Sequence, residues 1–320
     1  MKLAVRVSAI LLLSLSAQAQ SKDAATQWRV TQPAWTEYHE EQFGQFVARL
    51  GDAVEKRQCG KVNTCMLSTA NMYYGTDPSG LKYYSDCADL PYYLRGYFAW
   101  KNGLPFSVTA EVKPSPLNTD KVKDVRYSSQ GNMVTKRYDV LTKNGIFKNT
   151  YPNALEILND VVPGLTYSAT LRMSGSEDAE LYTDFYPVKI DRQGIRPGTV
   201  IYDPNGHVAV VYKVTDDGRV FYIDAHPDNS LTMGMFTPKF VRSNPNQGAG
   251  FKNSALCRWL MQNRIHLAPM LAAKSWRQIT TNCVTTVWSS SMELNQTVPA
   301  GAKASSCSAV SKSLITIISA

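Results

Sequence analysis

Apolar residues recur at the spacing of an α-helix in two stretches of the chain. In residues 36–55, where Thr36 stands at the N-cap position, the apolar positions are Phe43, Phe46, Val47, Leu50 and Val54. In residues 85–104 they are Leu90, Leu94, Tyr97 and Phe98. Asp86 can cap this second helix and Gly103 can end it. The pattern therefore predicts two helices that each bury one face.

Runs of β-branched and apolar residues predict an antiparallel hairpin farther along the chain. Residues 207–214 and 219–225 form its strands, and the polar residues 215–218 form its turn. Other strands are expected at 106–112, 124–141 (interrupted by a turn at 130–132), 165–173 and 184–190, and shorter helices at 61–70 and 153–162. Residues 227–250, rich in Pro, Asn, Gly and Ser, are expected to be a loop. Together these elements indicate an α+β fold.

The predicted hairpin carries three residues capable of acid–base chemistry. For either a two-residue or a four-residue turn, His207 and Asp224 point to the same face. With four, Val214 pairs with Arg219, so that His226 lies opposite His207 and Asp224 lies diagonal to it. The Asp224 carboxylate can then accept the Nδ1–H of His207 and leave Nε2 for proton transfer. His226 is the alternative third member of the group.

Cys87 stands at the predicted start of the helix in residues 85–104. The positive end of the helix dipole favours the thiolate, which is the nucleophilic form of cysteine. With His207 and Asp224, Cys87 would complete the nucleophile, base and orienting group of a cysteine hydrolase. Two simpler interpretations stay open: the cysteine packs in a core or joins a disulfide, and the histidine only packs.

The segments around these residues resemble the NlpC-type cell-wall hydrolases, which are papain-like cysteine peptidases related to the CHAP-type amidases. One element of the resemblance is Cys87 directly after an aspartate, preceded by a tyrosine- and glycine-containing loop at residues 73–80. The other is the run Pro197-Gly198-Thr199…Gly206-His207-Val208 that leads into the hairpin. These matches cover residues 72–104 and 196–226. The chain departs from the family in having Ala88-Asp89 where Ser-Gly is usual, and in its longer segment between cysteine and histidine.

The resemblance implies a papain-like fold, in which N-terminal helices with the nucleophile at a helix start pack on an antiparallel sheet that carries the histidine and the aspartate. It implies that Cys87, His207 and Asp224 are catalytic and that an amide or peptide bond in peptidoglycan is cleaved through an acyl-enzyme. Tyr73 or Tyr74 would line the cleft and donate a hydroxyl to the oxyanion, beside the backbone N–H of Cys87. Neither a cofactor nor a metal is expected.

Residues 1–19 have the basic start, apolar core and small-residue cleavage site of a secretory signal peptide. No cysteine follows that site, so a lipid anchor is not expected, and no later apolar run is long enough to span a membrane. The mature protein is therefore expected in the periplasm or outside the cell. The expected organisation is a catalytic domain at 20–250 with an inserted segment at 107–195, followed by a C-terminal extension at 251–320.

The chain is basic, with 34 lysines and arginines, 26 acidic residues and a net charge of +8. Loss of Lys2 and Arg6 with the leader would leave 32 basic residues and a net charge of +6. A positive charge suits an anionic polymer of the cell wall and also suits solubility alone. The basic residues are scattered and no basic helix or aromatic motif occurs among them, so nucleic acid is not an expected partner. The pattern gives no indication of an oligomeric state.

Six cysteines in an exported chain raise the question of disulfides. Cys59 and Cys65 are close enough in sequence to close a small loop, and this pair is predicted. If instead all six were paired, Cys87 would have no free thiol to act as a nucleophile, and the chain would be a binding or structural protein. A transglutaminase-like acyltransferase with the same triad is a further alternative. Zinc held by His207, Asp224 and His226 is a third, although no HExxH-like helix accompanies them.

Overall fold

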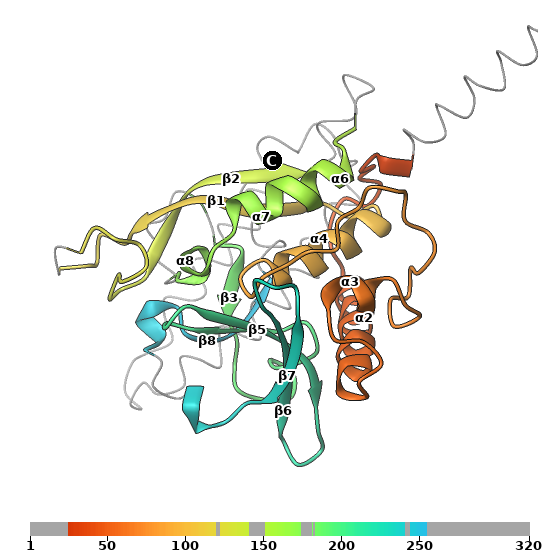
Figure 1. Cartoon of the computed structure of the whole chain (residues 1–320). Helices are drawn as coiled ribbons and strands as arrows, with labels where there is room; N and C mark the ends of the chain where they lie inside the picture. The colour runs from red at the N-terminus through yellow and green to blue at the C-terminus, as the bar shows by residue number, and fades with distance from the viewer. Residues whose placement is uncertain are drawn as a thin grey trace, which may run out of the picture.

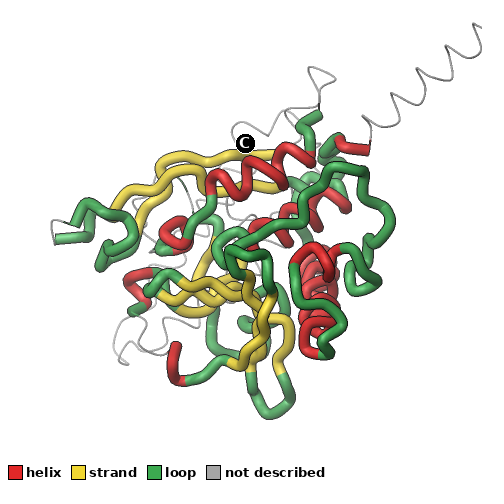
Figure 2. Tube along the Cα trace, in the orientation of Figure 1, coloured by secondary structure: helices red, strands yellow, loops and turns green. Residues whose placement is uncertain are grey.

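The computed structural model describes residues 25–119, 122–140, 151–173, 181, 183–240 and 244–254. The predicted signal peptide and most of the predicted C-terminal extension lie outside these ranges. The described chain has the expected α+β class, and its strands form two antiparallel sheets (Figure 1, Figure 2). Within it, no helix is both long and apolar enough to cross a bilayer.

The larger sheet has six strands, and each neighbouring pair is antiparallel. In spatial order they are β3 (Phe185–Pro187), β8 (Gly250–Ser254), β4 (Val200–Asp203), β5 (His207–Val214), β6 (Val220–Ala225) and β7 (Leu231–Met235). A separate two-stranded sheet pairs β1 (Phe106–Pro114) with β2 (Asn132–Val140). The predicted hairpin is therefore part of a larger sheet, between β4 and β7.

Two long helices pack against this framework. Helix α2 (Glu37–Glu55) begins after Thr36, whose hydroxyl and backbone N–H form a reciprocal cap with His39, so the predicted helix and cap are confirmed. Gly51 brings α2 against the Tyr212 ring of β5. Helix α4 (Leu90–Lys101) contacts both β1 and β5 and lies between the two sheets (Figure 1).

The remaining helices are short: α3 (Val62–Met66), α6 (Ala154–Glu156), the π-helix η1 (Ile157–Val161), α7 (Val162–Leu165), α8 (Ser168–Leu171) and the 3-10 turns η2 (Pro238–Phe240) and η3 (Pro245–Gln247). One large buried cluster joins α2 and α4 to the sheets and includes Phe106 and Leu158 from the segment at 107–195 and its border. The opposite face of the larger sheet buries a smaller cluster around Ile201, Val211 and Phe251.

The turn of the hairpin is longer than expected, but the strand ends away from the turn keep the predicted register. Val214 pairs with Val220 rather than Arg219, because the turn has one more residue. A β-bulge near Tyr212 absorbs that residue, so that Val211 pairs with Tyr222. Continuing this register brings His207 opposite His226. Their rings lie 6.4 Å apart between centroids, in agreement with the prediction for a four-residue turn.

Several element predictions are wrong. Residues 227–250 are not one loop, because β7 lies within them, and β8 crosses the expected boundary at residue 250 and lies between β3 and β4 in the sheet. Residues 165–173 contain α8 instead of a strand, and residues 124–131 are a turn before β2. Where a helix was expected to end at Pro163, α7 continues to Leu165. Proline at the first turn of α7 costs no hydrogen bond, and the wider π-helical turn precedes it.

Candidate active site

Asp86 caps the turn that carries Cys87. Its Oδ1 accepts the backbone N–H groups of Ala88 at 2.8 Å and Asp89 at 3.0 Å, and its carbonyl accepts that of Leu90 at 3.1 Å. The cap predicted for Asp86 is therefore present, although the regular helix α4 begins only at Leu90. Cys87 is the first residue after the cap, so its half-buried thiol stands at the N-terminal end of the helix.

The chain before Cys87 is held by the turn between β6 and β7. The Asn229 amide donates to the Tyr83 carbonyl at 3.0 Å and accepts the Ser85 N–H at 3.3 Å. Tyr84 donates its hydroxyl to the Pro227 carbonyl at 2.9 Å. Asn229 has a φ of +66°, a conformation that asparagine tolerates better than most residues. This turn therefore fixes the approach of the cysteine relative to the strand that bears Asp224.

His207 and Asp224 are hydrogen-bonded across β5 and β6. His207 Nε2 lies 2.8 Å from Asp224 Oδ2; the carboxylate is 8% exposed and the imidazole 37% exposed. The prediction that the two share one face is confirmed, but the predicted ring orientation is wrong. Because Asp224 lies diagonally on the next strand, the outer nitrogen Nε2 reaches it. Nδ1 is then the nitrogen left for Cys87.

The electrostatics of the site centre on the imidazole. Hydrogen bonding to Asp224 and to Cys87 raises the pKa of His207 to about 10, against the opposing effect of burial. Burial would raise the pKa of Asp224, but hydrogen bonds from His207 and Thr232 outweigh it and hold that pKa below its ordinary value. The thiol, the ring and the carboxylate thus form one coupled series of groups, with the carboxylate favouring a positive charge on the ring.

Thr232 is a site residue that the sequence did not reveal. It pairs directly with Asp224 across β6 and β7 and donates its hydroxyl to Asp224 Oδ1 at 2.6 Å. The Thr232 hydroxyl oxygen also lies 3.1 Å from His226 Nε2. A hydroxyl has one proton, so the His226 ring donates its Nε2–H to Thr232. Recognising β7 in the sequence would have placed Thr232 opposite Asp224.

His226 stands beside the pair without replacing Asp224. Its Nε2 is 3.7 Å from Asp224 Oδ2, and its ring stacks on that of His207. Its hydrogen bond goes to Thr232 rather than to His207. The hydrogen-bond partner of His207 is therefore Asp224 and not His226.

Tyr73 lies at the far end of α4 from the cysteine. The Tyr73 hydroxyl accepts the Asn102 amide at 2.6 Å, and its ring packs on Phe46. Asn102 caps the C-terminal end of α4, about 18 Å along the helix from the end that carries Cys87. The cleft role expected for Tyr73 is therefore wrong. Tyr74 lies in the adjoining turn with 54% of its surface exposed.

The predicted disulfide between Cys59 and Cys65 is present, with the Cα atoms 5.2 Å apart. Cys87 carries a free thiol. The remaining cysteines lie outside the described residues: Cys257, Cys283 and Cys307. The small disulfide loop docks on the β6–β7 turn, where Leu231 N–H donates to the Gly60 carbonyl at 2.9 Å.

Among the described residues, no group of histidines, cysteines and carboxylates has the arrangement of a metal site. His207 Nε2 is hydrogen-bonded to Asp224 Oδ2, and His226 Nε2 is hydrogen-bonded to the Thr232 hydroxyl. Hydrogen bonds between side chains hold Asp224, His207, Thr232 and His226 together in this site.

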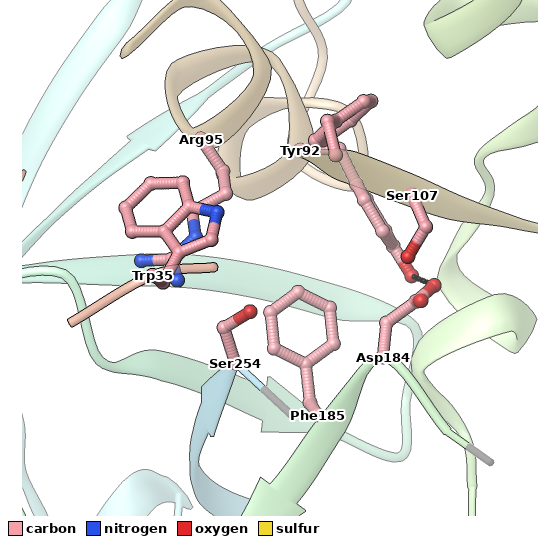
Figure 3. A pocket seen from close by; sticks show the side chains of 8 residues that line it. Trp35, Tyr92, Arg95, Ser107, Asp184, Phe185 and Ser254 are labelled. Carbon is pink, nitrogen blue, oxygen red and sulfur yellow. Dashed lines mark hydrogen bonds between the residues drawn. The ribbon is translucent and has the colours of Figure 1, made fainter. Parts of the chain in front are cut away.

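A cavity of about 20 Å³ elsewhere on α4 is lined by Trp35, Tyr92, Arg95, Phe106, Ser107, Asp184, Phe185 and Ser254 (Figure 3). Asp184 accepts the Tyr92 hydroxyl at 2.7 Å and the Thr109 N–H at 2.6 Å, and pairs with Arg137. Cys87 does not line it. A space of this size holds about one water, and its carboxylate is already satisfied. The cluster ties α4 to β1 and to the start of β3.

No family model, curated protein or solved structure matches this chain. The resemblance to the NlpC-type hydrolases therefore stays a prediction from local motifs.

Proposed function

We propose that this protein is an exported cysteine hydrolase with a papain-like arrangement, in which Cys87 is the nucleophile, His207 the base and Asp224 the orienting group. The observation that carries the proposal is the hydrogen bond between His207 and the buried Asp224 carboxylate, with the free thiol of Cys87 acting on the same imidazole. The three groups come from a helix start and two neighbouring strands, far apart in the sequence. The proposal accounts for this convergence by nucleophilic catalysis.

In the resting site His207 already carries a proton on Nδ1, as its raised pKa implies, and in the first half-reaction the Cys87 thiolate attacks the carbonyl carbon of the scissile amide. The backbone N–H of Cys87, at the positive end of the helix, faces the negative charge on the carbonyl oxygen. The C–N bond then breaks, and His207 gives its proton to the departing amine. Throughout, Asp224 accepts the Nε2–H and stabilises the imidazolium. A thioester on Cys87 is the product.

In the second half-reaction water attacks the thioester. His207 Nδ1 takes a proton from the water, the C–S bond breaks, and the carboxylic acid leaves. The proton stays on His207 beside the released Cys87 thiolate, and the resting site is restored. The balance is one water consumed for each amide bond cleaved, with no redox partner.

The proposed substrate is an amide or peptide bond of peptidoglycan. Its support comes from the motif resemblance, from the signal peptide predicted at residues 1–19 and from the net positive charge, which favours an anionic polymer. A disulfide is typical of a protein that matures in an oxidising compartment, which agrees with export.

The test is digestion of purified peptidoglycan by the mature protein and by Cys87→Ala, with fragments identified by mass spectrometry. The proposal expects new termini that appear with the wild type and vanish with the variant. Thr76→Ala, a change on the exposed loop before the site, is the matched control and should digest like wild type. Equal thermal unfolding of the three proteins shows that the variants are folded.

Two outcomes would contradict the proposal in different ways. A wild type that releases no fragments while Cys87 reacts with iodoacetamide would reject peptidoglycan as substrate. A Cys87 that fails to react because it is disulfide-bonded would reject the enzyme itself in favour of a binding protein. Addition of a primary amine separates hydrolysis from acyl transfer, because a transferase would yield the conjugate.

A further inference from the structure

Asp89 is a buried carboxyl group two residues after Cys87. It is 4% exposed, and the charged group that acts on it is Asp86, another acid of the same turn. Its Oδ2 accepts the Asp86 N–H at 3.5 Å, which reciprocates the bonds that Asp86 makes to the turn. Asp89 therefore belongs to the cap that shapes the Cys87 turn.

The other carboxyl oxygen of Asp89 reaches out of the turn to Thr166, the residue that ends α7. Asp89 Oδ1 contacts Thr166 Oγ1, and that hydroxyl is also 2.8 Å from the Val162 carbonyl. α7 belongs to the long segment between cysteine and histidine. This contact is thus a direct link between that segment and the cysteine turn.

The number of protons available shows which protonation state of Asp89 allows Thr166 to form both of these hydrogen bonds. The Thr166 hydroxyl has one proton, and the Val162 carbonyl can only accept. Both contacts are hydrogen bonds only when Asp89 supplies a second proton, as a neutral carboxylic acid. Burial raises the pKa of Asp89 to about 6, with the charge of Asp86 acting in the same direction and the Thr166 hydrogen bond opposing it.

We propose that Asp89 is a positioning residue for Cys87: in its neutral form it fastens the nucleophile turn to α7 through Thr166. Ionisation of Asp89 breaks one of the two Thr166 hydrogen bonds and adds a negative charge to the turn that carries Cys87. Thr166, the contact that faces it from α7, is neutral. The inference rests on the proposed nucleophilic role of Cys87.

The test is the rate at which iodoacetamide alkylates Cys87 in the full chain between pH 5 and 8, which needs no substrate. Asp89→Asn keeps a donor for Thr166 and cannot ionise. The ratio of its rate to that of wild type should rise roughly threefold as the pH passes through 6. Asp89→Ala and Thr166→Val remove the link and should slow alkylation about fivefold at pH 5.5. Asp160→Asn, an exposed carboxylate on η1, is the control.

A flat ratio for Asp89→Asn, or alkylation of Thr166→Val at the wild-type rate, would overturn the proposal. If Asp89→Ala does not fold, Thr166→Val still tests the link, because it leaves the carboxyl group in place. Failure of peptidoglycan digestion with these alkylation results intact would refute the substrate and leave the role of Asp89 standing.

Discussion

Thr232 lies directly across β6 and β7 from Asp224 and donates its hydroxyl to Oδ1 of that carboxylate at 2.6 Å. The other carboxylate oxygen holds His207 Nε2 at 2.8 Å. Because the carboxyl group is buried, each of its oxygens needs a donor, and the two donors together set its plane. The orientation of the imidazole therefore depends on a residue that never touches it.

Thr232→Val removes this donor while keeping the shape of the side chain. We expect activity to fall roughly tenfold, because a buried carboxylate oxygen is left without a hydrogen bond. Initial rates of peptidoglycan digestion measure the effect. Thr232→Ser keeps the hydroxyl and should stay close to wild type; equal losses in both variants would show that the hydroxyl is not the cause.

Asp224→Asn tests the orienting group itself. The amide cannot stabilise an imidazolium, so activity should fall by roughly 10³–10⁴-fold. His226→Gln retains a donor for Thr232 and should cost less than about tenfold. The reverse order of effects would make His226 the third member of the triad.

The raised pKa of His207 predicts a pH dependence of stability. The ring's ordinary pKa is 6.5 and its folded value is about 10, so its stabilising contribution is complete below about 6.5 and is lost as the pH rises through 10. The free energy of unfolding of wild type should therefore exceed that of His207→Gln most at pH 6 and least at pH 10. Urea denaturation at pH 6, 8 and 10 measures this difference.

His39→Gln is the matched control for that experiment. Burial lowers the pKa of His39, so its contribution should not decline between pH 6.5 and 10. A constant or growing difference for His207→Gln over this range would contradict an imidazolium held by Asp224.

The disulfide loop should stabilise the site as well as the fold. Replacing Cys59 and Cys65 together by alanine is expected to lower the free energy of unfolding by about 2 kcal/mol, from the entropy of a short loop. Reducing agent should lower the stability of wild type similarly and leave the double variant unchanged. Sensitivity of the double variant to reductant would point to another cause.

Gly51 lies where helix α2 packs closely against the Tyr212 ring of β5. A Cβ at this position would lie 2.1 Å from Tyr212 Cγ. Gly51→Ala should therefore lower the free energy of unfolding by about 2 kcal/mol or more, despite the better helix propensity of alanine. Gly60→Ala meets nothing within 4 Å and should change it by less than about 0.5 kcal/mol. Denaturant titration compares the two, and equal effects would refute close packing at Gly51.

Local sequence was sufficient to predict helix α2, the Asp86 cap, the β5–β6 hairpin and the Cys59–Cys65 pair. Each depends on residues within a few turns of helix or across one hairpin, where spacing alone decides which groups meet. The shared face of His207 and Asp224 belongs to this class, and a bulge even preserved the register at that end of the hairpin.

The tertiary structure decided which distant groups complete the site. Strand β7 brings Thr232 to Asp224, the β6–β7 turn brings Asn229 to the chain before Cys87, and α7 brings Thr166 to Asp89. It also decided that Nε2 of His207 faces the carboxylate and that Tyr73 packs at the far end of α4. Such contacts join residues tens of positions apart or segments with weak periodicity. Their partners are selected by the packing of the whole core, which no local pattern encodes.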